Sequence, residues 1–266
     1  MIQDQHIQIA ITAALQGGAA ILDVYNNAET KVEYKDDKSP LTQADGAAHR
    51  AIVKLLEPTG IPILSEEGKS IPTETRCSWS QLWIVDPLDG TKEFIKRNGE
   101  FTVNIALVEE GKPVAGVIYV PVLEELYVGT VGEGAYKLKA APDVLASALD
   151  WGSAQKLPVT HDIPFTAVGS RSHMNEDTAQ FLERYKAAHG EVAILSRGSS
   201  LKICMVAEGK AHVYPRFAPT MEWDTAAGQA IAESAGFEMV HPKTGASLQY
   251  NKEDLLNPHF IVRKPE

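Results

Sequence analysis

Two short apolar segments of the chain run directly into acidic residues, and this pattern limits the folds that the chain can adopt. Residues 61–64 and 82–85 are too short for a helix and are bounded by turn-forming residues, which predicts two strands. Ser65-Glu66-Glu67-Gly68 follows the first strand, and Asp86-Pro87-Leu88-Asp89-Gly90-Thr91 follows the second. Because functional side chains collect where strands end, we expect a sheet with a functional site at these two positions.

The rest of the pattern divides the chain into two parts. Apolar residues with helical spacing predict a long first helix over residues 4–25, and a hairpin is expected at Glu110-Gly111-Lys112. Strands and helices alternate from residue 165 onward, with helices expected over residues 175–188, 199–207 and 224–235. Residues 140–162 carry several prolines and little periodicity. We therefore expect an N-terminal α+β subdomain at residues 1–160 and a C-terminal α/β subdomain at residues 161–266.

The composition is that of a globular protein without a broad surface for polyanions. Of 266 residues, 44% are hydrophobic, and 35 acidic residues outnumber 25 basic ones, for a net charge of −10. This balance argues against nucleic acid and anionic lipid as partners. The most apolar N-terminal segment is interrupted by Thr12, Gln16, Gly17 and Gly18, and the first basic residue is Lys31. No membrane span, stable membrane insertion or secretory signal is expected, which predicts a cytoplasmic protein.

The motif after the second strand has the chemistry of a cation site. Pro87 fixes one φ angle and Gly90 permits a tight bend, so Asp86, the Leu88 carbonyl and Asp89 can turn toward one point. These hard oxygen ligands suit Mg²⁺ or Mn²⁺. Helices that begin near Thr91 and Asp224 would also direct backbone N–H groups at an anion.

Each acidic motif also has a simpler interpretation when it is taken alone. Asp-Pro-x-Asp-Gly is more often a surface turn than a metal site. Asp224 is more often a helix N-cap, and Asp45, three residues after Thr42, is more often part of a capping box. Glu66-Glu67 would ordinarily be a solvated pair. Only the combination of the motifs favours a site.

That combination resembles the lithium-sensitive, magnesium-dependent phosphatases of the inositol monophosphatase superfamily. The pattern of the superfamily is an upstream Asp, Glu-Glu, Asp-Pro-apolar-Asp-Gly-Thr and Trp-Asp-x-x-Ala. The chain has Asp45, Glu66-Glu67, Asp86 to Thr91 and Trp223-Asp224-Thr225-Ala226-Ala227 in this order. Residues 92–104, 198–202 and 214–217 are similar to its CysQ branch of 3′(2′),5′-bisphosphate nucleotidases. The resemblance implies an α+β fold, a layered α/β/α/β/α sandwich of two subdomains with the metal site between them.

The resemblance also implies the roles of individual residues. Two or three Mg²⁺ ions per site are implied, and Mn²⁺ can substitute. The implied ligands are Glu66, Asp86 and the Leu88 carbonyl for one ion, and Asp86, Asp89 and Asp224 for the second. A third, weaker ion would lie near Glu66. Asp45 and Thr91 would orient the attacking water, so that Asp45, Thr91 and Glu66 form the catalytic set, while Glu67 would lie behind the ligands.

The implied reaction is hydrolysis of the 3′-phosphate of 3′-phosphoadenosine 5′-phosphate (PAP) to AMP and phosphate, with its sulfated form, PAPS, as a further substrate in sulfur metabolism. The substrate contacts implied are Leu88, Asp89, Gly90, Thr91, His173, Ser199, Lys202, Arg216 and Asp224. The alternatives are an inositol monophosphatase or another small phosphomonoesterase of the superfamily, and a phosphonucleotide-binding protein with little turnover. A monomer or homodimer is expected. Related bacterial enzymes imply peripheral association with the cytoplasmic face of the inner membrane as an alternative location.

Overall fold

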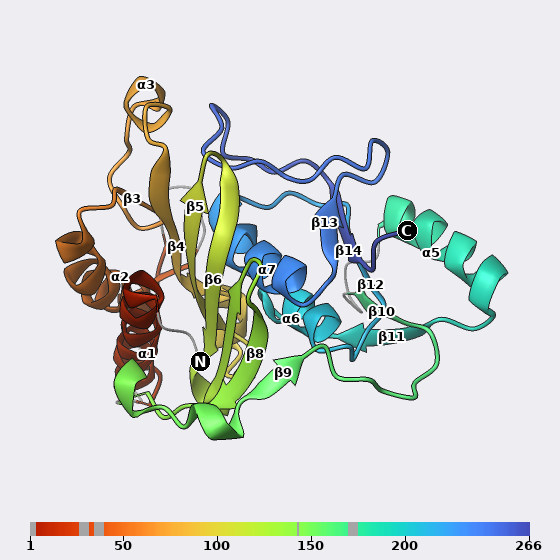
Figure 1. Ribbon diagram of the computed structural model, residues 1–266, viewed down its shortest axis with the longest axis horizontal. Helices are drawn as coiled ribbons and strands as arrows, with labels where there is room; N and C mark the ends of the chain where they lie inside the picture. The colour runs from red at the N-terminus through yellow and green to blue at the C-terminus, as the bar shows by residue number, and fades with distance from the viewer. Residues whose placement is uncertain (1–3, 27–31, 35–39, 143, 170–174) are drawn as a thin grey trace.

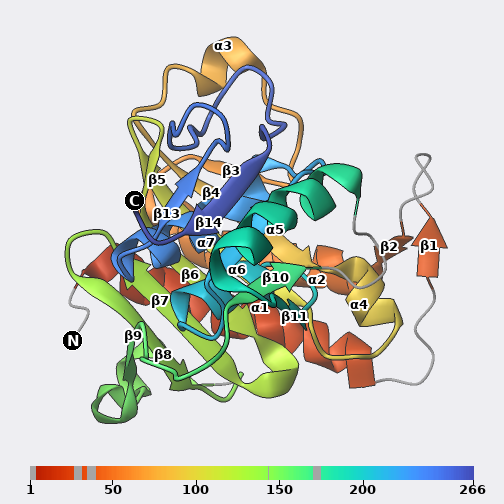
Figure 2. The same ribbon diagram turned by 90° about the vertical axis from the view of Figure 1, so that its right-hand side faces the viewer.

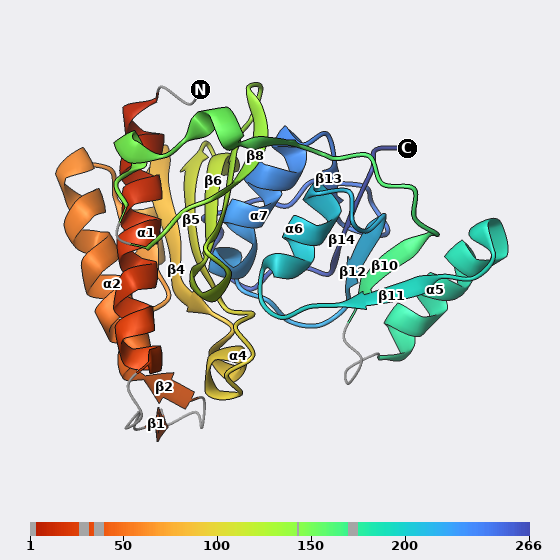
Figure 3. The same ribbon diagram turned by 90° about the horizontal axis from the view of Figure 1, so that it is seen from below.

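The computed structural model describes residues 4–26, 32–34, 40–142, 144–169 and 175–266. Its elements stack in layers (Figures 1 and 3): two helices, a seven-stranded sheet, two helices, a five-stranded sheet and one outer helix. The helices are α1 (Gln5–Asn26), α2 (Gln43–Leu56), α3 (Thr73–Arg76), α4 (Thr91–Ile95), α5 (Glu176–His189), α6 (Leu201–Ala207) and α7 (Glu222–Ser234). The expected α/β/α/β/α sandwich is confirmed.

The first sheet holds the strands that carry most of the predicted site. It comprises, in spatial order, β3 (Ile63–Ser65), β4 (Gln81–Asp89), β5 (Thr102–Glu109), β6 (Lys112–Val120), β7 (Glu125–Thr130), β8 (Gly134–Lys139) and β9 (Gln155–Leu157). β3 pairs with β4 in parallel and every later pair is antiparallel. The expected β5–β6 hairpin is present, with φ of 47° at Glu110 and 74° at Gly111. Positive φ at both turn residues suits the twist of a hairpin.

Helices α1 and α2 cover the outer face of this sheet (Figure 1). Helix α1 continues through the polar and small residues that were expected to interrupt an apolar span. Gly17 and Gly18 permit close packing, because a Cβ on them would lie 2.9 Å from Ile52 and 2.4 Å from the Tyr119 ring. The length and composition of α1 would allow it to cross a bilayer, which the sequence did not lead us to expect. However, half of its most apolar stretch is buried inside the fold. Such burial is typical of a core helix.

The second sheet and the two inner helices complete the sandwich. The strands, in spatial order, are β11 (Ala193–Ser196), β10 (Thr166–Gly169), β12 (Val213–Arg216), β14 (Phe260–Arg263) and β13 (Glu238–Val240). Helices α6 and α7 lie between the two sheets, and α5 lies outside the second one. Helix α7 packs directly on the first sheet, because a Cβ on Gly116 of β6 would lie 2.2 Å from the Ala227 carbonyl oxygen. No larger residue fits there without moving the helix.

Several details differ from the sequence expectations. Strand β9 lies in the segment expected to lack regular structure, and a ribbon of β1 (Val32–Tyr34) and β2 (Pro40–Thr42) stands beside α4 (Figure 2). Four 3-10 turns lie at Glu57–Thr59, Pro121–Leu123, Ala146–Ala148 and Trp151–Ser153. Helix α6 begins at Leu201 and not at residue 199, because Ser199 has a φ of 43° that a right-handed helix cannot contain. The division at residues 160 and 161 stays a prediction.

Candidate active site

The Asp86–Asp89 segment lies inside β4 and not in a turn after it. Asp86 pairs with Asn104 of β5 and Asp89 pairs with Thr102, and the register shifts between these pairs. Pro87, which lacks an N–H, is accommodated in this irregularity. The Asp86 carboxylate accepts a hydrogen bond from the Leu88 N–H at 3.0 Å. The strand therefore changes direction locally and brings both aspartates to the end of the sheet.

Glu66 follows β3, which is the parallel neighbour of β4. The Glu66 N–H donates to the Val85 carbonyl at 3.1 Å, which fixes the end of β3 beside the start of the Asp86 segment. Asp45 lies in the first turn of α2 and is 5% exposed. The negative charges of Asp45 and Glu67 contribute to raising the pKa of Glu66. The ends of β3 and β4 and the first turn of α2 thus place five carboxylates in one electrostatic neighbourhood, namely Asp45, Glu66, Glu67, Asp86 and Asp89.

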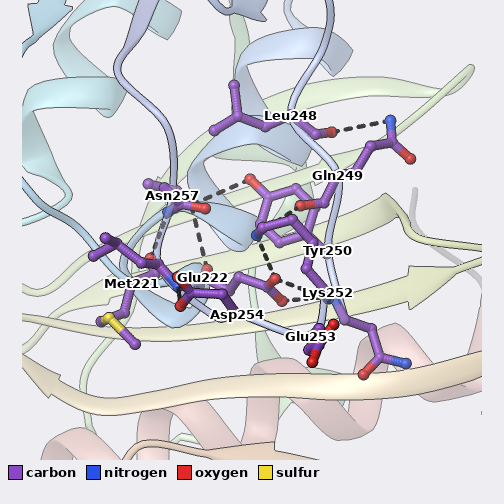
Figure 4. A network of polar contacts seen from close by, with 12 residues as sticks. Met221, Glu222, Leu248, Gln249, Tyr250, Lys252, Glu253, Asp254 and Asn257 are labelled. Carbon is purple, nitrogen blue, oxygen red and sulfur yellow. Dashed lines mark hydrogen bonds and ion pairs between the residues drawn. The ribbon is translucent and has the colours of Figure 1, made fainter. Parts of the chain in front are cut away.

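The inner helices bring the remaining ligand candidate to the same place. Asp224 is the third residue of α7, and its carboxylate accepts a hydrogen bond from the Met221 N–H at 2.8 Å. The expected helix start at Asp224 is therefore wrong by two residues, because Asp224 bonds back to the residue before the helix. The neighbouring Glu222 is fully buried and accepts bonds from the backbone N–H groups of Asn251 and Lys252 at 2.6 and 3.1 Å (Figure 4). This contact anchors the end of α7 that carries Asp224.

Burial, and after it the repulsion between these carboxylates, raises the pKa values of three of them. Burial, followed by the charges of Asp89 and others, raises the pKa of Glu66 to about 7. Burial and the charge of Asp89 likewise raise the pKa of Asp224 to about 7. Burial and the charges of Glu66, Asp89, Asp224 and Asp45 raise the pKa of Asp86 well above its ordinary range. A bound divalent cation would relieve this repulsion.

The donor set has the chemistry, but not yet the spacing, of a site for the metal that the superfamily implies. Within the described ranges, no group of three or more His, Cys, Asp or Glu side chains already lies close enough to enclose an ion. The Asp89 carboxylate is instead bonded to Ser200, and that of Asp224 to Met221. The chemistry of the set nevertheless fits Mg²⁺, since buried oxygen donors that raise each other's pKa are the groups that a hard cation stabilises.

Gly90 lies between the aspartates of β4 and the segment that contains Ser199. Gly90 has a φ of 94° and precedes α4, of which Thr91 is the first residue. A Cβ on Gly90 would lie 3.2 Å from the Cβ of Ser199. Glycine is needed here because φ is positive and because Ser199 approaches it closely.

A cavity of about 360 Å³ opens beside the carboxylates. Six predicted site residues line it, namely Asp89, Gly90, Ser199, Lys202, Arg216 and Asp224. Lys202 Nζ donates to the Ser199 carbonyl at 3.1 Å. Arg216 donates to the Pro219 carbonyl at 3.1 Å, while its buried Nε has no hydrogen-bond partner among the described residues. The cavity therefore combines Lys202 and Arg216, and two further cationic side chains, with the carboxylates of Asp89 and Asp224.

Other residues of the cavity were missed in the sequence. They include Asn175, Arg197, Tyr214 and Phe217. No signal could have placed Asn175 there, because it reads as the N-cap of α5, a role that it also has. Phe217 lies directly after Arg216, so it could have been found by its position. His173 lies outside the described residues. Asp45, Glu66, Asp86, Leu88 and Thr91 do not line this cavity as the structure has it.

Comparisons of the sequence and of the structure with known proteins all point to the same family. The sequence matches the inositol monophosphatase family over residues 2–265. It is 47% identical over 254 residues to the 3′(2′),5′-bisphosphate nucleotidase CysQ of Salmonella typhimurium, covering 94% of this chain and 96% of that protein. The CysQ protein of Escherichia coli K12 is 45% identical over 264 residues, covering 97% and 98%. A crystal structure of CysQ from Bacteroides thetaiotaomicron, described as a bacterial member of the inositol monophosphatase family, superposes with a TM-score of 0.89 at 53% identity, covering 97% of this chain and 96% of that one.

Proposed function

The chain belongs to the inositol monophosphatase family, as a phosphatase of its 3′(2′),5′-bisphosphate nucleotidase branch, and we propose that it removes the 3′-phosphate of PAP in a Mg²⁺-dependent reaction. The products are AMP and phosphate, and PAPS is a further substrate. One observation carries this proposal: the cavity that contains Asp89 and Asp224 also contains Lys202 and Arg216. Carboxylates for cations and cations for a second phosphate are what a bisphosphorylated substrate requires.

The metal ions have defined candidate ligands in this proposal. Glu66, Asp86 and the Leu88 carbonyl hold one ion, and Asp86, Asp89 and Asp224 hold the second, with a third, weaker ion near Glu66. When bound, Mg²⁺, or Mn²⁺ in its place, neutralises charge on the phosphoryl group and lowers the pKa of a bound water. The mutually raised pKa values of the carboxylates support this assignment.

The protein side chains then bind and orient the reactants. Asp45 and the Thr91 hydroxyl orient the attacking water, with Asp45 as the acceptor for its proton. Lys202 and Arg216 bind the 5′-phosphate, for which the unpartnered Nε of Arg216 is a suitable donor. Ser199 and His173 contact the nucleoside. Positioning and charge neutralisation are the main requirements, since phosphoryl transfer needs no covalent intermediate with the protein.

The first test is phosphate release from PAP and from inositol 1-phosphate by the purified protein. We expect a preference for PAP with Mg²⁺, loss of activity with EDTA, and inhibition by Li⁺. A preference for inositol 1-phosphate would keep the metal site and overturn the substrate assignment. Tight PAP binding without Mg²⁺-dependent release would point to a phosphonucleotide-binding protein and overturn the enzymatic proposal.

Lys202→Ala and Arg216→Ala test the phosphate contacts. Each is expected to raise KM for PAP about tenfold or more, because a hydrogen bond to a charged group contributes about 1.5–3 kcal/mol. Release from inositol 1-phosphate should change less, since that substrate has no second phosphate. Lys243→Ala, which removes an exposed lysine that does not line the cavity, is the matched control. An unchanged KM for PAP in both variants would contradict the assignment.

We also propose that the enzyme works in the cytoplasm on a small nucleotide. Peripheral association with the inner face of a membrane and the choice between monomer and homodimer stay predictions.

A further inference from the structure

A chain of buried hydrogen bonds crosses from the first sheet to α6 beneath Asp89. Thr102 Oγ1 donates to Asn104 Oδ1 at 2.9 Å, and Asn104 Nδ2 donates to Ser200 Oγ at 2.9 Å. Ser200 Oγ and the Ser200 N–H each lie 2.6 Å from Asp89 Oδ2. Thr102, Asn104 and Ser200 are at most 3% exposed. Such burial of polar side chains is unfavourable unless their bonds are satisfied, as they are here.

Ser200 occupies a position where its hydroxyl ordinarily has another role. It is the N-cap of α6, where a serine side chain usually accepts a bond from the first turn of its own helix. The Ser200 side chain makes no such bond. Its hydroxyl lies instead between Asp89 Oδ2 and the Asp224 carbonyl oxygen, which is 2.8 Å away. The capping bond is thus replaced by contacts to two of the candidate metal ligands.

The single proton of this hydroxyl limits what it can do. Asn104 donates to Ser200 Oγ, so the hydroxyl proton remains for only one of its two acceptors at a time. The bond to the Asp89 carboxylate is the stronger one while that group carries its full charge. When a cation draws charge from Asp89, the hydroxyl can turn to the Asp224 carbonyl without leaving a buried group unbonded.

We propose that Ser200 is a positioning residue for the metal site, supported by Asn104 and Thr102. The two bonds from Ser200, with a longer one of 3.5 Å from Asn104 Nδ2, fix Asp89 Oδ2, and no hydrogen bond to Asp89 Oδ1 occurs within the described part of the chain. Oδ1 is therefore the oxygen presented to a cation. Because Ser200 also contacts Asp224, it couples the ligand from β4 to the ligand from α7. This inference rests on the proposed function, since it concerns the same metal ions.

Cation binding to the full-length protein tests the proposal without an activity assay. In Mn²⁺ titrations followed by calorimetry, Ser200→Ala is expected to bind Mn²⁺ about tenfold more weakly, as is typical when a hydrogen-bond partner of a ligand is removed. Ser200→Thr keeps the hydroxyl and should restore most of the affinity. Ser234→Ala, which removes a hydroxyl that bonds the Ala230 carbonyl on α7, is the matched control and should bind Mn²⁺ normally.

Kinetics and a second variant complete the test. Ser200→Ala should lower kcat at limiting Mg²⁺ while KM for PAP stays unchanged, because Lys202 and Arg216 are untouched. If Ser200→Ala does not fold, Thr102→Val tests the proposal in its place, because it removes the hydrogen bond to Asn104 that supports Ser200. This variant is expected to bind Mn²⁺ about threefold more weakly. Wild-type affinity in the folded variant would overturn the inference alone. Failure of the wild-type protein to bind Mn²⁺ would overturn the proposed metal site and this inference with it.

Discussion

Asp89→Asn is expected to lower phosphate release from PAP about a thousandfold while the protein remains folded. Loss of one charged metal ligand removes several kcal/mol of stabilisation from the transition state, and each 1.36 kcal/mol is a factor of ten. The fold should persist because the asparagine oxygen can accept the same two bonds from Ser200. Phosphate release at saturating Mg²⁺, together with the unfolding temperature, measures both effects. Unchanged turnover would remove Asp89 from the metal site.

The same variant has a second expected effect, on the stability of the metal-free protein. The charge of Asp89 contributes to the raised pKa of Glu66 and of Asp224, each about 7. A carboxyl whose pKa is higher in the folded state binds more protons there, so stability decreases as the pH rises from about 4 to 7. In EDTA the unfolding temperature of the wild-type protein should therefore fall over this range, and that of Asp89→Asn should fall less. Asp150→Asn, at an exposed turn, is the control that should follow the wild type.

The resemblance implied the order of the layers, while the local signals of the sequence predicted individual elements. The first helix was expected over residues 4–25 and is α1, Gln5–Asn26, since its apolar residues recur at helical spacing. The motif around Asp86 was predicted to follow its strand but is part of β4. Pro87 reads as the end of a strand, and only the register shift against β5 lets the strand continue past it.

The candidate site was predictable where a motif carried it, and not where tertiary packing did. Asp45, Glu66, Asp86, Asp89 and Asp224 are marked by their motifs, although the catalytic role of Asp45 and the roles of the other four as ligands stay proposals. Strand β9 has only three residues and no periodic signal, so its pairing with β8 depends on the rest of the sheet. The contribution of Ser200 depends on a contact between segments 111 residues apart. One sequence signal was available, because Thr102 and Asn104 are polar residues on one face of an apolar strand.

A buried carboxylate outside the predicted set supports the end of α7. Glu222 is 0% exposed, and besides two backbone N–H groups its carboxylate accepts a bond from Lys252 Nζ at 2.5 Å (Figure 4). On the other side of the same loop, the buried Arg76 of α3 donates to the Asn251 side chain and the Lys252 carbonyl at 3.0 and 2.9 Å. The loop therefore links α3 to the helix that carries Asp224.

Glu222→Ala is expected to destabilise the protein by about 3 to 5 kcal/mol, the usual effect of removing one partner of a buried ion pair. It leaves the N–H groups of Asn251 and Lys252 without their acceptor, and the unfolding temperature should fall by roughly 10 °C. Denaturant unfolding in EDTA measures this without a contribution from metal. Glu253→Ala, on the same loop but exposed, should change stability by less than about 0.5 kcal/mol, because Arg76 bonds its backbone carbonyl and not its side chain. If both variants have equal stability, Glu222 does not anchor α7, and the position of Asp224 must depend on its own bond to Met221.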